Sequence, residues 1–343
     1  MRSIGTVVCS LAVMGVVLGA QAGGGAQGQT GQQGQAQGQA AGQQQGQAAG
    51  QQQGQTAGQQ QGGRQGRGGR QAGPPSMGGG QCSASPYNCP DAPNPLPKAS
   101  TVWIEEMTWM DVRDALKEGK TTVIISTGGV EPNGPWLVTG KHNYVLRANC
   151  DAIARKLGDA LCAPVVPFVP EGRLDPPSGH MTSPGTISVT EETFAALLTD
   201  IVKSFKAHGF KNIMLIGDSG GNTRGMQAVA TALNTEWGGN PLVAHIREHY
   251  DYNSVEKHMA SKGFIKSGAS DGLHDDPIIS LNMFMADPKS IRYEERVKAR
   301  KATINGVSLA DRKKNLELGR EIVEFRATVT ANAIKRAIDA NKK

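Results

Sequence analysis

Acidic residues and lysines are missing from the first 90 residues, whose only charged side chains are Arg2, Arg64, Arg67 and Arg70. Without these four, the 36 basic residues of the chain fall to 32, against 30 acidic ones. The remainder of the chain is therefore close to neutral, although the formal net charge is +6. A near-neutral domain lacks the basic surface that nucleic acids require, so we expect no nucleic-acid partner.

Large apolar side chains are almost absent from Gly23 to Gln81, where glycine and glutamine dominate. Such a stretch cannot bury a core, and we expect it to have no fixed structure. Its three octads, Ala41–Ala48, Ala49–Thr56 and Ala57–Arg64, are too short and too polar to stack as a solenoid. Residues 23–99 are predicted to be a low-complexity segment followed by a proline-rich linker.

Long hydrophobic runs are absent after the N-terminus, which excludes a protein with several membrane spans. Residues 1–22 have the features of a signal peptide: the basic Arg2, an apolar run over Ile4–Leu18, and the small residues Ala20 and Ala22 at a cleavage site. The apolar run is short for a membrane anchor. We therefore expect cleavage, export to the periplasm or the medium, and no stable membrane anchor.

Cysteines are few, and Cys82, Cys89, Cys150 and Cys162 would remain after cleavage. Export permits disulfides, and the short loop between Cys82 and Cys89 suits a bridge. Cys150 falls within a helical pattern. If Cys162 continued that helix, the two would lie roughly 18 Å apart, beyond the reach of a disulfide. We expect Cys150 and Cys162 to be buried free thiols.

From residue 100 to 343, β-branched runs alternate with amphipathic patterns, which indicates one domain with a parallel sheet. The expected strands are Thr121–Ser126, Cys162–Val169, Asn212–Ile216 and Leu242–Ile246. The expected helices are Trp109–Gly119, Asn143–Leu157, Glu191–His208, Thr223–Trp237 and a last one over about Ala310–Ala340. The predicted fold class is α/β, with a mostly parallel central sheet between two helical layers.

Polar side chains follow three of these strands, in the loops Gly128–His142, Glu171–Gly185 and Gly217–Gly225. A further polar segment begins at His274. The carboxyl ends of parallel strands open on one edge of the sheet, so these loops should meet there. Convergent acids and imidazoles are what a metal or acid–base site requires.

These loops resemble the motifs of the creatininase family (creatinine amidohydrolase-like proteins). The family motif G-x-x-E-x-H-G-P-H-L-P-x-x-T-D has the spacing of Gly128–His142, and F-P-G-T-I-S corresponds to Ser183–Ser188. The motif N-G-H-G-G-N corresponds to Gly217–Asn222, and H-A-G-E loosely to the segment that begins at His274. The resemblance covers about residues 121–324 and implies the three-layer fold of that family.

The departures from the family motifs fall on the metal ligands. Glu131 is retained, whereas Asn133 replaces a histidine and His142 replaces an aspartate. The third-motif histidine aligns with Ser219, or with Asp218 if one residue is inserted. The second alignment suggests that a histidine and an aspartate have exchanged places. We expect Glu131, His142 and Asp218 to hold one divalent metal, Zn, Mn or Fe, rather than two.

The resemblance also implies the chemistry, which is hydrolysis of a non-peptide C–N bond, often in a cyclic amide, by metal-activated water. Glu131, Ser219 and His274 are the expected catalytic residues, with His274 passing a proton to the departing nitrogen. We expect contacts with a small-molecule substrate from four further residues, which are Asn133, Trp136, His180 and Asn222. Relatives commonly assemble, so a homo-oligomer is expected.

Several alternatives remain open. A relative without a metal would bind a ligand and not turn it over. Gly217–Gly221 also fits the G-x-S-x-G pattern of a serine hydrolase, with Ser219 as nucleophile. His142 could instead cap a helix, and Glu171 is expected to be a solvated loop acid rather than an extra ligand. Asn222 is expected to be the N-cap of its helix.

Overall fold

The computed structural model describes residues 85–266 and 274–342. The predicted signal peptide, the Gly/Gln-rich stretch and Cys82 lie outside these residues, and the expectations for them stay predictions. Among the described residues, no helix is both long enough and apolar enough to cross a bilayer.

Four parallel strands form the central sheet, in the order β2-β1-β3-β4. They are β1 (Thr122–Thr127), β2 (Ala160–Cys162), β3 (Asn212–Gly217) and β4 (Leu242–His245). β1 and β3 pair along their whole lengths, from Thr122 beside Asn212 to Thr127 beside Gly217. This long pairing brings the ends of β1 and β3 to the same level. The loops that follow these two strands therefore start side by side.

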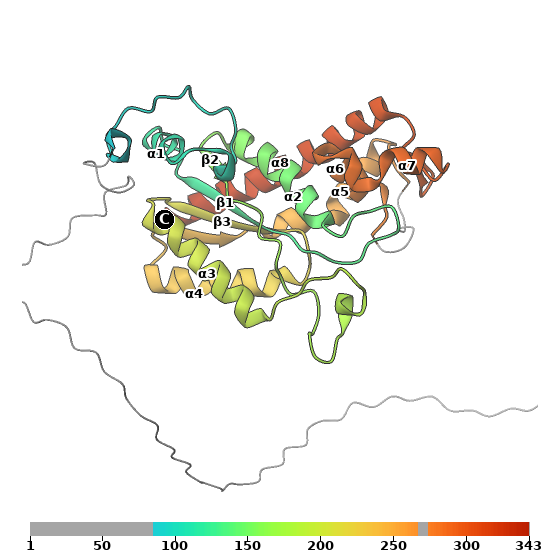
Figure 1. Cartoon of the computed structure of the whole chain (residues 1–343), viewed down its shortest axis with the longest axis horizontal. Helices are drawn as coiled ribbons and strands as arrows, with labels where there is room; N and C mark the ends of the chain where they lie inside the picture. The colour runs from blue at the N-terminus through green and yellow to red at the C-terminus, as the bar shows by residue number, and fades with distance from the viewer. Residues whose placement is uncertain (1–84, 267–273, 343) are drawn as a thin grey trace, which may run out of the picture. The chain divides into compact units, whose positions relative to one another are not determined.

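Helices cover both faces of the sheet, as Figure 1 shows, so the predicted three-layer α/β fold is confirmed. α1 (Trp109–Lys117), α3 (Glu191–Ala207) and α4 (Asn222–Trp237) lie over one face. α2 (Lys141–Leu157) and α8 (Arg312–Asn341) lie over the other face. Successive strand residues alternate between the two: Ile125 packs in the α3–α4 layer, and Ile124 in the α2–α8 layer.

A third apolar cluster lies beyond the end of β4. It combines α5 (Tyr252–Ser261), α6 (Pro277–Ala286), α7 (Tyr293–Lys298) and the hairpin of β5 (Thr303–Ile304) and β6 (Val307–Ser308) with the first half of α8. The five short 3₁₀ turns of the described residues are η1 (Pro86–Asn88), η2 (Ile104–Glu106), η3 (Gly179–Thr182), η4 (Arg247–Tyr250) and η5 (Pro288–Ile291). Because α8 reaches from this cluster back across the sheet, it joins the two parts of the fold.

The helix starts follow from local sequence. Thr108 and Asp111 form a reciprocal capping box at α1, and the Thr190 hydroxyl accepts from the Thr193 N–H at α3. α4 begins one residue earlier than expected, because Gly221 is its N-cap and Asn222 is its first residue. The Asn222 side chain is thereby free to bind elsewhere.

The second strand is much shorter than the sequence predicts. Regular pairing ends at Cys162, and beyond it only single bridges form, from Val166 to Thr127 and from Val169 to Ser188. Pro164, Pro167 and Pro170 interrupt this segment, and a proline has no N–H to donate to a neighbouring strand. The chain nevertheless stays extended beside β1 and reaches the carboxyl edge of the sheet at Glu171.

The expectation of two free thiols is wrong, because Cys150 and Cys162 form a disulfide. α2 ends at Leu157, and Gly158 turns the chain back with a φ of +84°, so that Cys162 lies on β2 rather than on the helix. The two Cα atoms are 6.2 Å apart. The bridge therefore ties the middle of α2 to the adjacent edge strand.

We expect the double variant Cys150→Ser, Cys162→Ser to unfold with a free energy about 2–3 kcal/mol lower than the wild type. The bridge closes a short loop, so its removal returns conformational entropy to the unfolded chain. Urea unfolding followed by circular dichroism measures the difference. Wild type unfolded in reducing buffer should match the double variant, and an unchanged midpoint in both would contradict the stabilising role.

Candidate metal centre

Glu131 and His142 face each other at the carboxyl edge of the sheet, although eleven positions separate them in the sequence. Glu131 lies in the loop after β1, and His142 is the second residue of α2. His142 Nε2 is 3.0 Å from Glu131 Oε1, and both side chains are almost completely buried. His142 does not cap α2, because Gly140 occupies the N-cap position. The structure therefore brings together two of the residues that the sequence analysis proposed as metal ligands.

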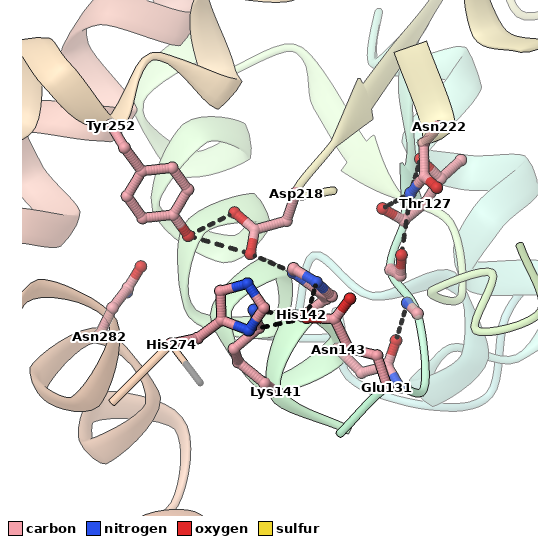
Figure 2. Close-up of polar contacts among 12 residues, drawn as sticks. Thr127, Glu131, Lys141, His142, Asn143, Asp218, Asn222, Tyr252, His274 and Asn282 are labelled. Atoms are coloured by element: carbon pink, nitrogen blue, oxygen red, sulfur yellow. Dashed lines mark hydrogen bonds and ion pairs between the residues drawn. The ribbon is translucent and has the colours of Figure 1, made fainter. Parts of the chain in front are cut away.

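Asp218 directly follows β3 and lies on the other side of the His142 ring (Figure 2). Its Oδ2 is 2.9 Å from His142 Nδ1, and the Tyr252 hydroxyl donates to both of its oxygens, at 2.8 and 3.0 Å. Arg326 donates to Oδ1 at 2.8 Å. The structure therefore corrects the prediction that Asp218 is a metal ligand. Its oxygens accept hydrogen bonds from Tyr252, Arg326 and His142, and it orients the His142 ring instead.

The tautomer of His142 follows from this arrangement. Burial opposes the charge of Asp218, but the Arg326 guanidinium and the hydrogen bond from His142 hold the pKa of Asp218 well below its usual range. An ionised carboxylate at Nδ1 makes that nitrogen the donor. Nε2 is then the nitrogen that faces Glu131. A carboxylate behind an imidazole is the usual arrangement around a metal-binding histidine.

Glu171 is the third acid of the site, and the expectation that it is a solvated loop residue is wrong. It is only 6% exposed. A Cβ on Gly129 would lie 2.0 Å from Glu171 Oε1, so the glycine is what lets this carboxylate approach the loop after β1. Burial, and then the nearby charge of Glu131, raise the pKa of Glu171 to about 7.

The donor atoms of Glu131, His142 and Glu171 lie within 4.8 Å of one another. Glu171 Oε1 is buried without a hydrogen bond among the described residues, whereas Glu131 Oε1 lies 3.0 Å from His142 Nε2 and 2.7 Å from Lys141 Nζ. Buried polar atoms of a native protein nearly always have a partner. Two carboxylates and one imidazole are ligands suited to Zn or Mn, so these residues fit a divalent metal ion.

His180 and His274 lie at the rim of this cluster. His180 Nδ1 is 2.8 Å from Glu131 Oε2 and 3.2 Å from Glu171 Oε2. His274 Nδ1 is 3.2 Å from Glu131 Oε1. Each of the two side chains is 39% exposed, so both can meet a ligand that enters from solvent.

The other predicted site residues mainly hold the loops. Asn133 donates to the carbonyls of Glu131 and Val138, and its Oδ1 lies 3.3 Å from His274 Nδ1. Asn222 donates to the carbonyls of Thr127 and Gly128, and so fastens the end of β1 to the start of α4. These amide groups shape the site instead of facing its opening.

Trp136 and Ser219 are not part of the three-residue cluster. The Arg296 guanidinium lies 5.7 Å from the Trp136 ring centre. Ser219 is a buried residue, and its hydroxyl makes no hydrogen bond to a histidine among residues 85–266 and 274–342. The nucleophile–base contact of a serine hydrolase is therefore missing between described residues.

Sequence reasoning missed Arg326 and Tyr252. Arg326 is a fully buried arginine in the middle of α8 that also donates to the His249 carbonyl. Its guanidinium lies 4.5 Å from the centre of the Tyr252 ring. The only available signal was an arginine within an apolar stretch of a helix, and nothing in the sequence links it to Asp218.

We expect Arg326→Met to lower the free energy of unfolding by about 3–5 kcal/mol, because it leaves the Asp218 carboxylate buried and without its cation. The double variant Arg326→Met, Asp218→Asn should recover part of this loss, since the unpaired carboxylate at position 218 is also removed. Urea unfolding of both variants and the wild type gives the comparison. A double variant no more stable than Arg326→Met would contradict the pairing.

His249 gives the stability of the protein a predictable pH dependence. Burial, and then the neighbouring Arg326, lower the pKa of His249 to about 3. The unfolded chain therefore binds a proton near pH 6.5 that the folded chain does not bind until about pH 3. Stability is complete above pH 6.5 and falls as the pH drops through this window, by at most about 1.4 kcal/mol per pH unit. His249→Gln should show a shallower fall in urea unfolding at stepped pH. If the free energy of unfolding of His249→Gln fell with pH as steeply as that of the wild type, the role of His249 would be contradicted.

A family model described as creatininase (creatinine amidohydrolase) matches residues 105–333, well over half of the chain. A solved creatininase with Mn covers 69% of this chain and 98% of its own, at 18% identity and a TM-score of 0.51. A mutant creatininase described as the Zn-Zn type has the same coverage and identity, with a TM-score of 0.50. At this identity the two structures establish the fold.

A curated relative from Thermotoga maritima, a 3-dehydro-scyllo-inosose hydrolase, is 26% identical over 125 residues. The match spans 36% of this chain and 38% of the relative, which is less than half of either. Together with the fold, the family match defines the class: this is an α/β protein with the creatininase fold. The chain belongs to the creatininase family.

Proposed function

We propose that the protein is an exported, metal-dependent amidohydrolase that acts on a non-peptide C–N bond of a small molecule, with cyclic amides as the first class to test. The observation that carries the proposal is the convergence of two buried carboxylates and one buried imidazole: the donor atoms of Glu131, His142 and Glu171 lie within 4.8 Å of one another. The creatininase fold places this set at the carboxyl edge of the sheet, where α/β proteins bind their ligands.

Glu131, His142 and Glu171 would hold one divalent ion. When bound, such an ion lowers the pKa of water and polarises a carbonyl group. Asp218 keeps the His142 ring in place through Nδ1, and Arg326 with Tyr252 keeps Asp218 ionised and fixed. The chain thus supplies a rigid support for the imidazole.

His274 is suited to move the proton that leaves a hydrolytic water. Burial, and then the charge of Lys141, lower the pKa of His274 to about 4, so its ring is neutral at pH 7 and has a lone pair to accept a proton. Asn133 Oδ1 lies beside its Nδ1 and sets the ring orientation. His274 can then deliver the proton to the departing nitrogen. His180, whose ring centre lies 6.2 Å from that of His274, would contact the substrate beside it.

The compartment is part of the proposal. The disulfide between Cys150 and Cys162 favours an oxidising environment, in agreement with the signal-peptide pattern of residues 1–22.

We also propose a homo-oligomer on the basis of the family. Light scattering of the exported protein over a wide concentration range tests this, and a monomer throughout would remove the idea.

We expect the purified wild type to bind about one Zn or Mn ion per chain, and Glu131→Gln and Glu171→Gln each to weaken that binding by about 100-fold, because each removes one charged ligand. Elemental analysis and titration calorimetry measure this. Hydrolysis of a panel of cyclic amides should fall in parallel and be abolished by a chelator. The matched control is Glu294→Gln, an exposed acid on α7, which should bind metal as the wild type does.

A second candidate function is ligand binding without turnover, and the buried Lys141 beside Glu131 is the observation that favours it. In that case the lysine alone would balance the charge of the acids. A folded wild type that was prepared without chelator, carries no metal and takes none up at saturating Zn or Mn would reject the amidohydrolase proposal in favour of this one.

A further inference from the structure

Lys141 is a buried ammonium in an unfavourable position. It is the first residue of α2, and its side chain is 2% exposed. Burial of a charge is costly unless an opposite charge accompanies it, and the N-terminus of a helix repels a cation. A lysine is therefore stable here only because the site supplies a nearby anion.

Glu131 is that anion. Lys141 Nζ lies 2.7 Å from Glu131 Oε1, the same oxygen that lies 3.0 Å from His142 Nε2. Figure 2 shows the Lys141 side chain and the His142 ring beside Glu131. One carboxylate oxygen of the cluster is thus shared between the imidazole and an ammonium that belongs to the chain itself. A metal ion at the cluster must share this oxygen with Lys141.

The charge of this loop end also differs from the family motif in a definite way. Lys141 and His142 stand where the motif has threonine and aspartate. Loss of the aspartate and gain of the lysine make the loop end more positive by two charges, even when His142 is neutral. Two charges are what one divalent ion carries.

We propose that Lys141 is a built-in cation of the centre: its ammonium holds the Glu131 oxygen that faces His142, limits the site to one ion, and weakens the binding of that ion. This inference rests on the proposed function, because it concerns the same cluster. It assigns Lys141 as a positioning residue that competes with metal for Glu131.

The test compares Mn²⁺ binding by three proteins: the wild type, Lys141→Met and Lys203→Met. Elemental analysis gives the number of bound ions, and electron paramagnetic resonance distinguishes free from bound Mn²⁺. Lys203 is an exposed lysine on α3, so its variant matches the change in net charge at a distance from the site. We expect the wild type to saturate at one ion. Lys141→Met should bind Mn²⁺ at least about tenfold more tightly, because a like charge beside the ligand is gone, and Lys203→Met should not change.

A second variant, Lys141→Gln, and thermal melting of all the proteins keep the test valid if Lys141→Met folds poorly. Without the lysine, Glu131 lacks its ammonium counter-charge, so saturating Mn²⁺ should raise the melting temperature of either Lys141 variant more than that of the wild type. Equal affinity and equal thermal shifts in all proteins would overturn the proposal, and so would two ions in the wild type. If the wild type binds no Mn²⁺, the amidohydrolase proposal fails, and a gain of binding in Lys141→Met alone would still establish the role of the lysine.

Discussion

The pairing of Asp218 with Arg326 is the contact on which the arrangement of the site depends. Asp218 is fully buried at the end of β3, and Arg326 comes from the middle of α8, more than a hundred residues later. A carboxylate could not stay ionised there without the guanidinium. The pair thereby fixes α8 against the carboxyl edge of the sheet, and through His142 it also fixes the start of α2.

Charges of opposite sign alternate from this pair toward solvent. Arg326, Asp218, His142 and Glu131 follow one another at hydrogen-bond or ion-pair distances, and Lys141 flanks Glu131. Each charge is compensated by its neighbours. The low dielectric of the interior therefore strengthens the electrostatic attraction between neighbours in this series. Burial, outweighed by the hydrogen bonds to Asp218 and Glu131, leaves the pKa of His142 raised. The site is therefore rigid before any ligand binds.

Local patterns in the sequence predicted most of the fold. β1, β3, α3 and α4 were found within a residue or two, because burial alternation and capping are local properties. β2 and the disulfide were not, since they depend on where Gly158 turns the chain and on prolines that break a strand but leave it extended. Glu171 was misjudged for a similar reason: a loop acid is usually solvated, and only the packing of that loop against Gly129 buries it.

The sequence analysis proposed His142 and Asp218 as ligands of one metal, and the structure brings them together as a hydrogen-bonded pair instead. A histidine at position 142 projects from a helix start into the space between two loops, so both of its ring nitrogens need partners. Asp218 meets Nδ1 and is thereby turned away from the cluster. The third donor must then come from a different loop, and the proline-rich continuation of β2 delivers Glu171. Replacement of one acidic ligand by an imidazole therefore shifts the roles of both acids, because a ring with two nitrogens needs a partner on each side.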